Sequence, residues 1–512
     1  MDMQMLRDQI WLEQPLGRTE TTAIVEGEVT LPGGLREEAR VLLADCTPVV
    51  ENCEAMQDRA SIGGRAIFRV LYTQGDAKRV QVMETTADFT HMCDFPGCQG
   101  KAVVTASPHV EHVNARTAGG RLMLRSEIGL DVQAVSAAPV EALTGFDGSD
   151  DVELLLSEKE IRRTVARGTR EVLLREELEI PSGADVRETL FGTALVTVSE
   201  VTGGMGRAGM SGTVELEAVH AAAREDQPLL VTRHSFPFQQ TVELSGEDGQ
   251  LLQGRAAVKD VAVVSQPSED GTRILRAEVL LALEARADRK ENVSVVSDAY
   301  TTGGDDLRLT RQTIRCRAED TALQAAESGR VTLLLPDSAP PVRRVLAAFV
   351  TPSSVSFAQN GARMTAEGKL DTTLLYMTDD SAAPVSIHQS EPFRASFAVQ
   401  ADMEAAPVLT ASQAEALPVT SDRVELRYIL HLSADAWRDT QLTIVTEAQP
   451  TAAGPLTKDI VLCFVQPGET LWDVARRYRV PLDALRDLNP GVSDEPAEGD
   501  GILVWRRQII NA

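Results

Sequence analysis

The chain is poor in aromatic residues, and basic residues are outnumbered by acidic ones. Phe, Trp and Tyr make up only 4% of its 512 residues, and the formal net charge is −26. An acidic chain is repelled by phosphate backbones, which argues against nucleic acid and anionic membranes as partners. The hydrophobic share of 43% is ordinary. A chain of this length and composition is expected to form several domains with real cores.

Long apolar runs are also missing. No stretch approaches the length needed to span a bilayer. The opening residues, MDMQMLRDQIWLEQ, lack the basic and apolar regions of a secretory signal. We therefore expect a cytoplasmic protein without a transmembrane segment.

Cysteines are few and irregularly spaced, which fits a reducing compartment. Cys93 and Cys98 are too far apart for a zinc knuckle, and Cys46 and Cys53 are farther apart still. We expect buried or surface thiols and no metal site.

Residues 1–452 contain a divergent threefold repeat, each landmark of which returns after about 150 residues, a usual domain length. Each repeat has a strand ending in Leu-Pro or Ile-Pro, a glycine-led strand, a phenylalanine and a strand that contains Leu-Arg. The prolines are Pro32, Pro181 and Pro336; the glycines are Gly64, Gly212 and Gly368; the phenylalanines are Phe89, Phe238 and Phe393; and the Leu-Arg pairs begin at Leu124, Leu275 and Leu426. So long a period marks tandem domains and not the turns of a solenoid.

Apolar and polar residues alternate with period two in these segments, and helical windows are nearly absent before the C-terminal region. We predict a mainly β protein with three antiparallel domains, each a sandwich or an open barrel, over residues 1–150, 151–304 and 305–452. Linkers are expected at residues 145–151 and 301–306. A third, Pro/Ala-rich linker at residues 447–456 is expected to be extended and mobile.

Three features of the repeats bear on whether the chain has a catalytic site. His220 replaces Tyr72 and Tyr376 of the other repeats and is expected to pack at a strand end. The arginines after the repeated leucines are expected to pair with acids on a neighbouring strand. No pair of carboxylates recurs at one place, and no Gly-x-Ser-x-Gly elbow is present.

Residues 204–209, Gly-Met-Gly-Arg-Ala-Gly, match the Gly-x-Gly-x-x-Gly pattern of dinucleotide-binding sites in sequence but not in structural context. That fingerprint needs a strand before it and a helix after it, whereas a strand pattern follows here, which favours a hairpin loop. We therefore predict no catalytic residue and no cofactor.

The C-terminal region changes from strand to helix patterning. Thr470 is placed to cap a helix whose apolar face begins at Leu471, with Asp473 completing a capping box. Pro481 ends that helix or opens the next. A turn at Asn489-Pro490-Gly491 precedes a short final strand. Residues 453–512 are thus predicted to form a small βααβ domain, near the lower size limit for independent folding.

This region resembles a LysM module, which usually holds N-acetylglucosamine polymers and sometimes a protein. The matching residues are Val465, Gly468, Thr470, Leu471, Ala475, Val480, Leu485, Asn489, Gly499, Leu503 and Val504. The resemblance implies a binding groove between residues 468–472 and 489–491. The predicted partner- or glycan-binding residues are Gly468, Glu469, Thr470, Leu471, Trp472, Arg476, Arg477, Asn489, Pro490 and Gly491. Trp472 is read either as an anchor for sugar or protein or as a residue that only packs the corner.

The whole chain resembles the family of SPOCS-domain proteins that end in a LysM module. The resemblance rests on the repeated landmarks, on Pro237-Phe238 and Pro392-Phe393, and on Asp298-Ala299-Tyr300. The first repeat departs from it, with Asp88 before Phe89 and no Asp-Ala-Tyr. The resemblance implies spore coat assembly in the mother-cell cytoplasm at the forespore surface, with a coat-basement ATPase and other coat proteins as partners.

Two functions remain. In the first, three β domains form the arm of a non-enzymatic scaffold, and the C-terminal module docks it to a coat protein. In the second, the chain binds peptidoglycan in the cell wall. The missing secretory segment and the single LysM-like module, which would hold glycan weakly, favour the scaffold.

Overall fold

The computed structural model describes residues 4–31, 39–74, 79–147, 151–181, 183–267, 273–303, 305–381, 383–452 and 460–505. Pro32, and parts of the three predicted linkers, lie outside these residues. Among the described residues the chain is mainly β, as predicted, and its two helices both belong to the C-terminal module.

Three units with the same strand order make up the body of the molecule, and each contains two facing antiparallel sheets. In the first unit the sheets are β1-β6-β5 and β2-β3-β4; in the second, β7-β13-β12, with β11 at its edge, and β8-β9-β10; in the third, β14-β19-β18 and β15-β16-β17. The strands of the first unit are β1 (Gln4–Thr30), β2 (Ala39–Met56), β3 (Arg59–Gln74), β4 (Val80–Asp94), β5 (Val103–Ala118) and β6 (Arg121–Asp147). Those of the second are β7 (Val152–Glu179), β8 (Val186–Gly204), β9 (Arg207–Ala222), β10 (Leu229–Glu243), β11 (Ser245–Gly246), β12 (Leu251–Pro267) and β13 (Arg273–Thr301). Those of the third are β14 (Asp306–Leu334), β15 (Arg344–Asn360), β16 (Arg363–Met377), β17 (Val385–Ala398), β18 (Glu404–Pro418) and β19 (Arg423–Thr451).

The glycines and phenylalanines of the repeat are partners across neighbouring strands. Gly212 on β9 stands opposite Phe238 on β10. A Cβ on Gly212 would lie 2.0 Å from the carbonyl oxygen of Thr197 and 2.7 Å from the Phe238 ring. The same pairing recurs in the other units, between Gly64 and Phe89 and between Gly368 and Phe393. The repeated glycine therefore makes room for the aromatic ring that fills each unit's core.

The repeated Leu-Arg pairs divide between core and surface. Leu275 is fully buried in the core of the second unit. Arg276 points outward and pairs with Glu177 on the neighbouring strand at 2.8 Å, and Arg125 lies 3.8 Å from Glu26 on β1. Arg276 therefore pairs across strands as predicted. Arg125 lies closer to Glu127 on its own strand, at 3.3 Å, than to Glu26. Arg427 pairs with Glu425, which is also on its own strand.

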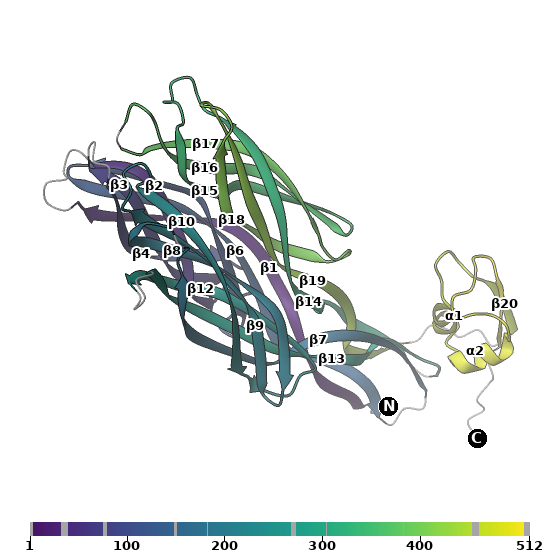
Figure 1. The fold of residues 1–512 in the computed structure, drawn as a ribbon. Coiled ribbons are helices and arrows are strands. Elements are labelled where there is room, and N and C mark those ends of the chain that lie inside the picture. The colour runs from purple at the N-terminus through teal and green to yellow at the C-terminus, as the bar shows by residue number, and fades with distance from the viewer. Residues whose placement is uncertain are drawn as a thin grey trace.

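The three units pack side by side along the molecule instead of following one another as an arm (Figure 1). At one end they share an apolar cluster that includes Leu71, Val219 and Leu375, one residue from each unit. At the other end the paired long strands share a second cluster that includes Leu12, Ile161 and Cys316. Sharing these cores buries apolar surface that an extended arm would leave in water.

Beside the first shared core, His220 is fully buried at the strand end where the other units have tyrosine. Its two ring nitrogens lie 3.0 Å from the Thr189 hydroxyl and 2.8 Å from the Thr232 hydroxyl. Its packing role is as predicted.

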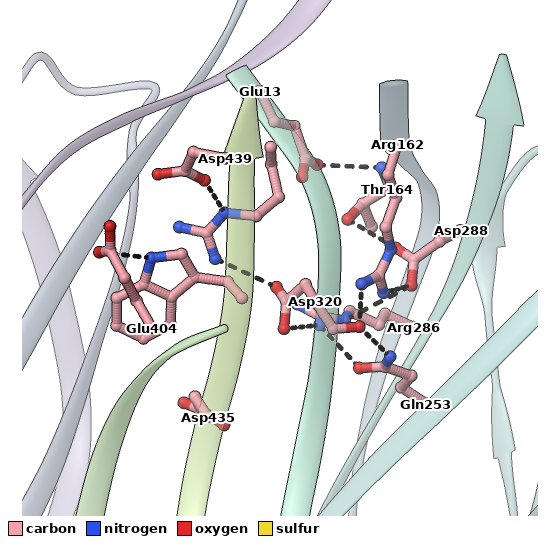
Figure 2. Close-up of polar contacts among 12 residues, drawn as sticks. Glu13, Arg162, Thr164, Gln253, Arg286, Asp288, Asp320, Glu404, Asp435 and Asp439 are labelled. Atoms are coloured by element: carbon pink, nitrogen blue, oxygen red, sulfur yellow. Dashed lines mark hydrogen bonds and ion pairs between the residues drawn. The ribbon is translucent and has the colours of Figure 1, made fainter. Parts of the chain in front are cut away.

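Buried and partly buried charges join the units near the second shared core (Figure 2). Glu13 of the first unit accepts the backbone N–H of Thr164 in the second at 3.0 Å. Arg286 of the second unit pairs with Asp320 of the third at 2.8 Å, and Gln253 donates to the Asp320 carbonyl at 2.5 Å. Burial alone would raise the pKa of Asp320, but the nearby arginines, led by Arg286, outweigh it and lower that pKa.

The predicted linkers are shorter in the structure than the sequence suggests. Residues 145–147 continue β6, and residues 447–451 form the end of β19 instead of a mobile linker. They are held because β19 pairs along its whole length with β14, down to Thr451 opposite Asp306. Residues 453–456 of that linker lie outside the described part of the chain. The glycine-rich string is a two-residue hairpin turn between Gly204 and Arg207, as predicted.

Candidate functional site

The C-terminal module, residues 460–505, has the predicted βααβ order. Its elements are β20 (Ile460–Phe464), α1 (Leu471–Tyr478), α2 (Leu482–Leu488) and β21 (Gly501–Trp505). Thr470 caps α1 and forms the expected capping box with Asp473. Pro481 occupies the N-cap position of α2 and makes no side-chain capping hydrogen bond. The two strands pair antiparallel, with Ile460 opposite Trp505.

Several predicted binding residues hold the module together. Leu471 is fully buried in its core. The Asn489 side chain donates to the carbonyls of Leu485 and Leu503 and accepts the Leu503 N–H, each at 2.8 Å. Glu469 pairs with Arg477 at 3.0 Å. Thr470 serves as the cap. These four residues therefore stabilise the fold of the module itself.

Two others, Trp472 and Arg476, face the second unit of the body. The Trp472 indole N–H donates to Asp298 Oδ2 at 2.9 Å, and Arg476 Nη1 reaches the same oxygen at 2.8 Å. The Tyr300 ring meets the Trp472 ring edge to face, with 4.8 Å between centroids. Trp472 is only 6% exposed. In this structure its indole is a packing residue at a contact between the module and the body.

We call this contact the seat: Asp298, Tyr300 and Thr301 of the second unit, which hold α1 and the turn after it. The Tyr300 hydroxyl donates to the Val480 carbonyl at 2.8 Å, and burial raises the pKa of that hydroxyl. Arg479, itself buried, donates to the Thr301 carbonyl at 2.9 Å. Sequence reasoning noted Asp298-Ala299-Tyr300 as a family mark but gave it no role, because nothing local shows a contact across so many residues.

The remaining predicted binding residues, Gly468, Arg477, Pro490 and Gly491, are exposed. Gly468 and Gly491 have positive φ angles of 75° and 104°, and a Cβ on either would meet nothing within 4 Å. The loops on both sides of the expected groove are therefore open to solvent. Leu471 N donates to the Asp494 carbonyl at 2.9 Å and ties the first loop to the chain that follows the second.

An exposed apolar surface on the module was not predicted. We call it the outer sheet face; its residues are Ile460, Leu462, Phe464 and Trp505, which are 65%, 59%, 63% and 50% exposed. Cys463 and Val465 alternate with them and are buried against α1. The sequence held a signal, because residues 460–465 are apolar on both faces, and a strand with one face in water normally alternates.

Comparison with protein families agrees with this geometry. The SipL, SPOCS domain family matches residues 39–118, and the LysM domain family matches residues 465–495. The chain therefore carries a SPOCS domain in its first unit and a LysM domain in its C-terminal module. No curated protein and no solved structure matched the chain.

The SPOCS match falls on the first unit, from the start of β2 to the end of β5. The LysM match begins after β20 and ends before β21, so it spans both helices. Both are binding or scaffold domains without catalytic chemistry of their own, and the SPOCS domain indicates a sporulation-related protein.

The cysteines of the described residues are unpaired and mostly buried. All six cysteines are free, and five are buried. Burial raises the pKa of Cys46 to about 12 and that of Cys316 to about 11. Within the described ranges, no three His, Cys, Asp or Glu side chains gather where they could hold a metal ion. Among the same residues, no helix is long and apolar enough to cross a bilayer.

Proposed function

We propose that this protein is a non-enzymatic scaffold of spore coat assembly whose LysM domain docks onto a coat-basement morphogenetic protein. By the family resemblance that partner is an ATPase, and docking takes place in the mother-cell cytoplasm at the forespore surface. The observation that carries the proposal is the outer sheet face. Four large apolar side chains stand together on a small domain, where a soluble module normally places polar ones.

The chemistry of this face fits a protein better than a sugar. A flat apolar patch with an aromatic residue is typical of the centre of a protein interface. Glycans need several convergent polar groups, and among its four side chains the outer sheet face supplies a single one, the indole N–H of Trp505. The body supports a scaffold as well, because three units that share cores form one rigid platform.

Peptidoglycan binding is the second candidate. It is favoured by the LysM match and by the open loops at Gly468 and Gly491. A single module would hold a glycan weakly, since wall-binding proteins often gain avidity from several copies.

The two functions are separated by one capture experiment with the intact chain. Immobilised protein is incubated with lysate of sporulating mother cells and, in parallel, with purified peptidoglycan, and captured proteins are identified by mass spectrometry. We expect the coat-basement ATPase to be retained and peptidoglycan to remain unbound. Retention of peptidoglycan without the ATPase would replace the proposal with the glycan-binding function.

A further inference from the structure

The seat lies where the second unit breaks the threefold repeat. Ala299 and Ala448 occupy one shared apolar cluster, each three residues after a buried valine, Val296 or Val445. They are therefore equivalent positions of the second and third units. Tyr300 then corresponds to Gln449. Only Tyr300 has an aromatic ring to offer the module, which identifies this departure from the repeat as a feature built for contact.

Tyr300 is part of the core of the LysM domain. It is 1% exposed and clusters with Leu471, Val474 and Val480 of that domain. No other residue in this cluster comes from the body. The small module thus completes its core with a side chain from the second unit, in keeping with its marginal size.

Asp298 gathers the polar side of the seat. Its carboxylate accepts from Trp472 and Arg476 of the module, from Arg311 of the third unit and from the backbone N–H of Ala299. Charge-assisted hydrogen bonds of this kind are strong and directional, so they fix orientation as well as proximity.

A second contact from the body extends the seat. Glu153, on β7, lies beside Leu482 at the start of α2, and burial raises the pKa of this carboxylate. Both helices of the module therefore lie against the second unit.

We propose that the seat, formed by Asp298, Tyr300 and Thr301, is a docking site for the LysM domain of the same chain and mounts that domain rigidly on the second unit. The chain path fits a contact within one molecule. Thr451, at the end of β19, pairs with Asp306, which follows Thr301 by five positions. The seven residues 453–459 can extend to about 25 Å, and so short a tether keeps the module at high effective concentration near its seat.

Docking of the LysM domain on the seat determines how the outer sheet face is presented to a partner. The seat engages α1 and its following turn, whereas the outer sheet face is formed by side chains that point away from the helices. A mounted LysM domain therefore presents that face outward at a fixed orientation to the body. The use of this face for binding rests on the proposed function, whereas the docking of the LysM domain on the seat does not.

The test uses the intact chain with ¹⁵N-labelled tryptophan and no partner present. Four indole N–H signals are expected from the four tryptophans, and Trp472 is assigned by its loss in Trp472→Phe. We expect slow hydrogen exchange for Trp472. Asp298→Ala and Arg476→Ala are each expected to speed that exchange by about tenfold or more, because a charge-assisted bond is lost. Small-angle scattering of the same variants should show a larger maximum dimension.

Two matched controls accompany these variants. Arg477→Ala removes the neighbouring arginine, which does not touch the body, and Gln449→Ala alters the equivalent position in the third unit. Neither should change the exchange of Trp472. The signals of Trp11 and Trp437 report whether the body remains folded, and Arg476→Ala leaves the body sequence intact.

The proposed docking of the LysM domain on the seat would be wrong if both Asp298→Ala and Arg476→Ala left the hydrogen exchange of Trp472 and the scattering unchanged. Failure to capture the coat-basement ATPase would leave these readouts unaffected and would count against the proposed function alone.

Discussion

At the scale of single residues, the repeated glycine is required because it has no side chain. Gly212 has no Cβ, and the Phe238 ring and a backbone carbonyl occupy the space where a Cβ would be. This is why the glycine and the phenylalanine recur together in all three units. The repeat could be found from the sequence, but the pairing could not, because it depends on the register between two strands.

Gly212→Ala tests this role. A methyl group 2.0 Å from the Thr197 carbonyl oxygen cannot be accommodated without backbone movement. We expect the free energy of unfolding to fall by about 1–3 kcal/mol, as for other overpacked cores, measured by thermal or urea unfolding. Gly204→Ala is the control, since a Cβ there meets nothing within 4 Å. Equal stability of the two variants would contradict the pairing argument.

His220 gives the protein a specific sensitivity to acid. Burial lowers its pKa from 6.5 to about 4. Between those values the unfolded chain binds a proton that the folded chain does not. The stability contributed by neutral His220 is therefore present above about pH 6.5 and is lost as the pH falls to about 4. Thermal midpoints of the native protein should drop over this window.

His220→Gln keeps a donor and an acceptor for Thr189 and Thr232 but does not titrate in this range. We expect it to lose less stability than the native protein between pH 6.5 and pH 4. His234 and His431 also have lowered pKa values, so some acid sensitivity will remain. Identical pH profiles for the two proteins would exclude His220 as a source.

Among the elements, those of the C-terminal module show best which structural features can be predicted from the sequence and which cannot. The cap at Thr470, the break between the helices at Pro481 and the two helices themselves were predicted because local propensity fixes them. The outer sheet face was not, because an apolar strand does not reveal which of its faces is covered. The seat was beyond local reasoning, since Tyr300 and Trp472 are far apart in the chain and only the assembled fold brings their rings together.

Leu462→Ser tests the outer sheet face as the docking surface. Leu462 is 59% exposed and does not belong to the module core, so the fold should persist. We expect the affinity for the coat-basement ATPase to fall by about tenfold or more, as for a central interface residue. Leu334→Ser is the matched control, because Leu334 is 57% exposed on the body. Equal losses from both changes would argue against a dedicated face.

As a whole molecule, the protein is a body of three fused β units that carries a small mounted domain. The three antiparallel units followed from period-two patterning and from the repeat. Their side-by-side packing did not, because the residues that join them, such as Arg286 and Asp320, read as ordinary surface charges in the sequence. In the folded protein they form an ion pair between two units, and each largely buried charge needs the other to offset its loss of solvation.

Asp320→Ala tests the junction between the second and third units. Its removal leaves Arg286, whose side chain is 18% exposed, without its main partner. Breaking a buried pair in this way typically costs about 3–5 kcal/mol, so we expect a marked fall in the thermal midpoint. Glu278→Ala breaks the exposed Arg175–Glu278 pair and should cost less than about 1 kcal/mol. A comparable, small effect of both changes would show that the junction does not hold the units together.

The central claim is that this chain docks a protein and not a glycan. The most direct measurement is an equilibrium titration of the intact chain with the purified coat-basement ATPase, run beside a titration with soluble peptidoglycan fragments. We predict saturable binding to the ATPase and no saturation with the glycan. Saturable glycan binding without binding to the ATPase would contradict the account.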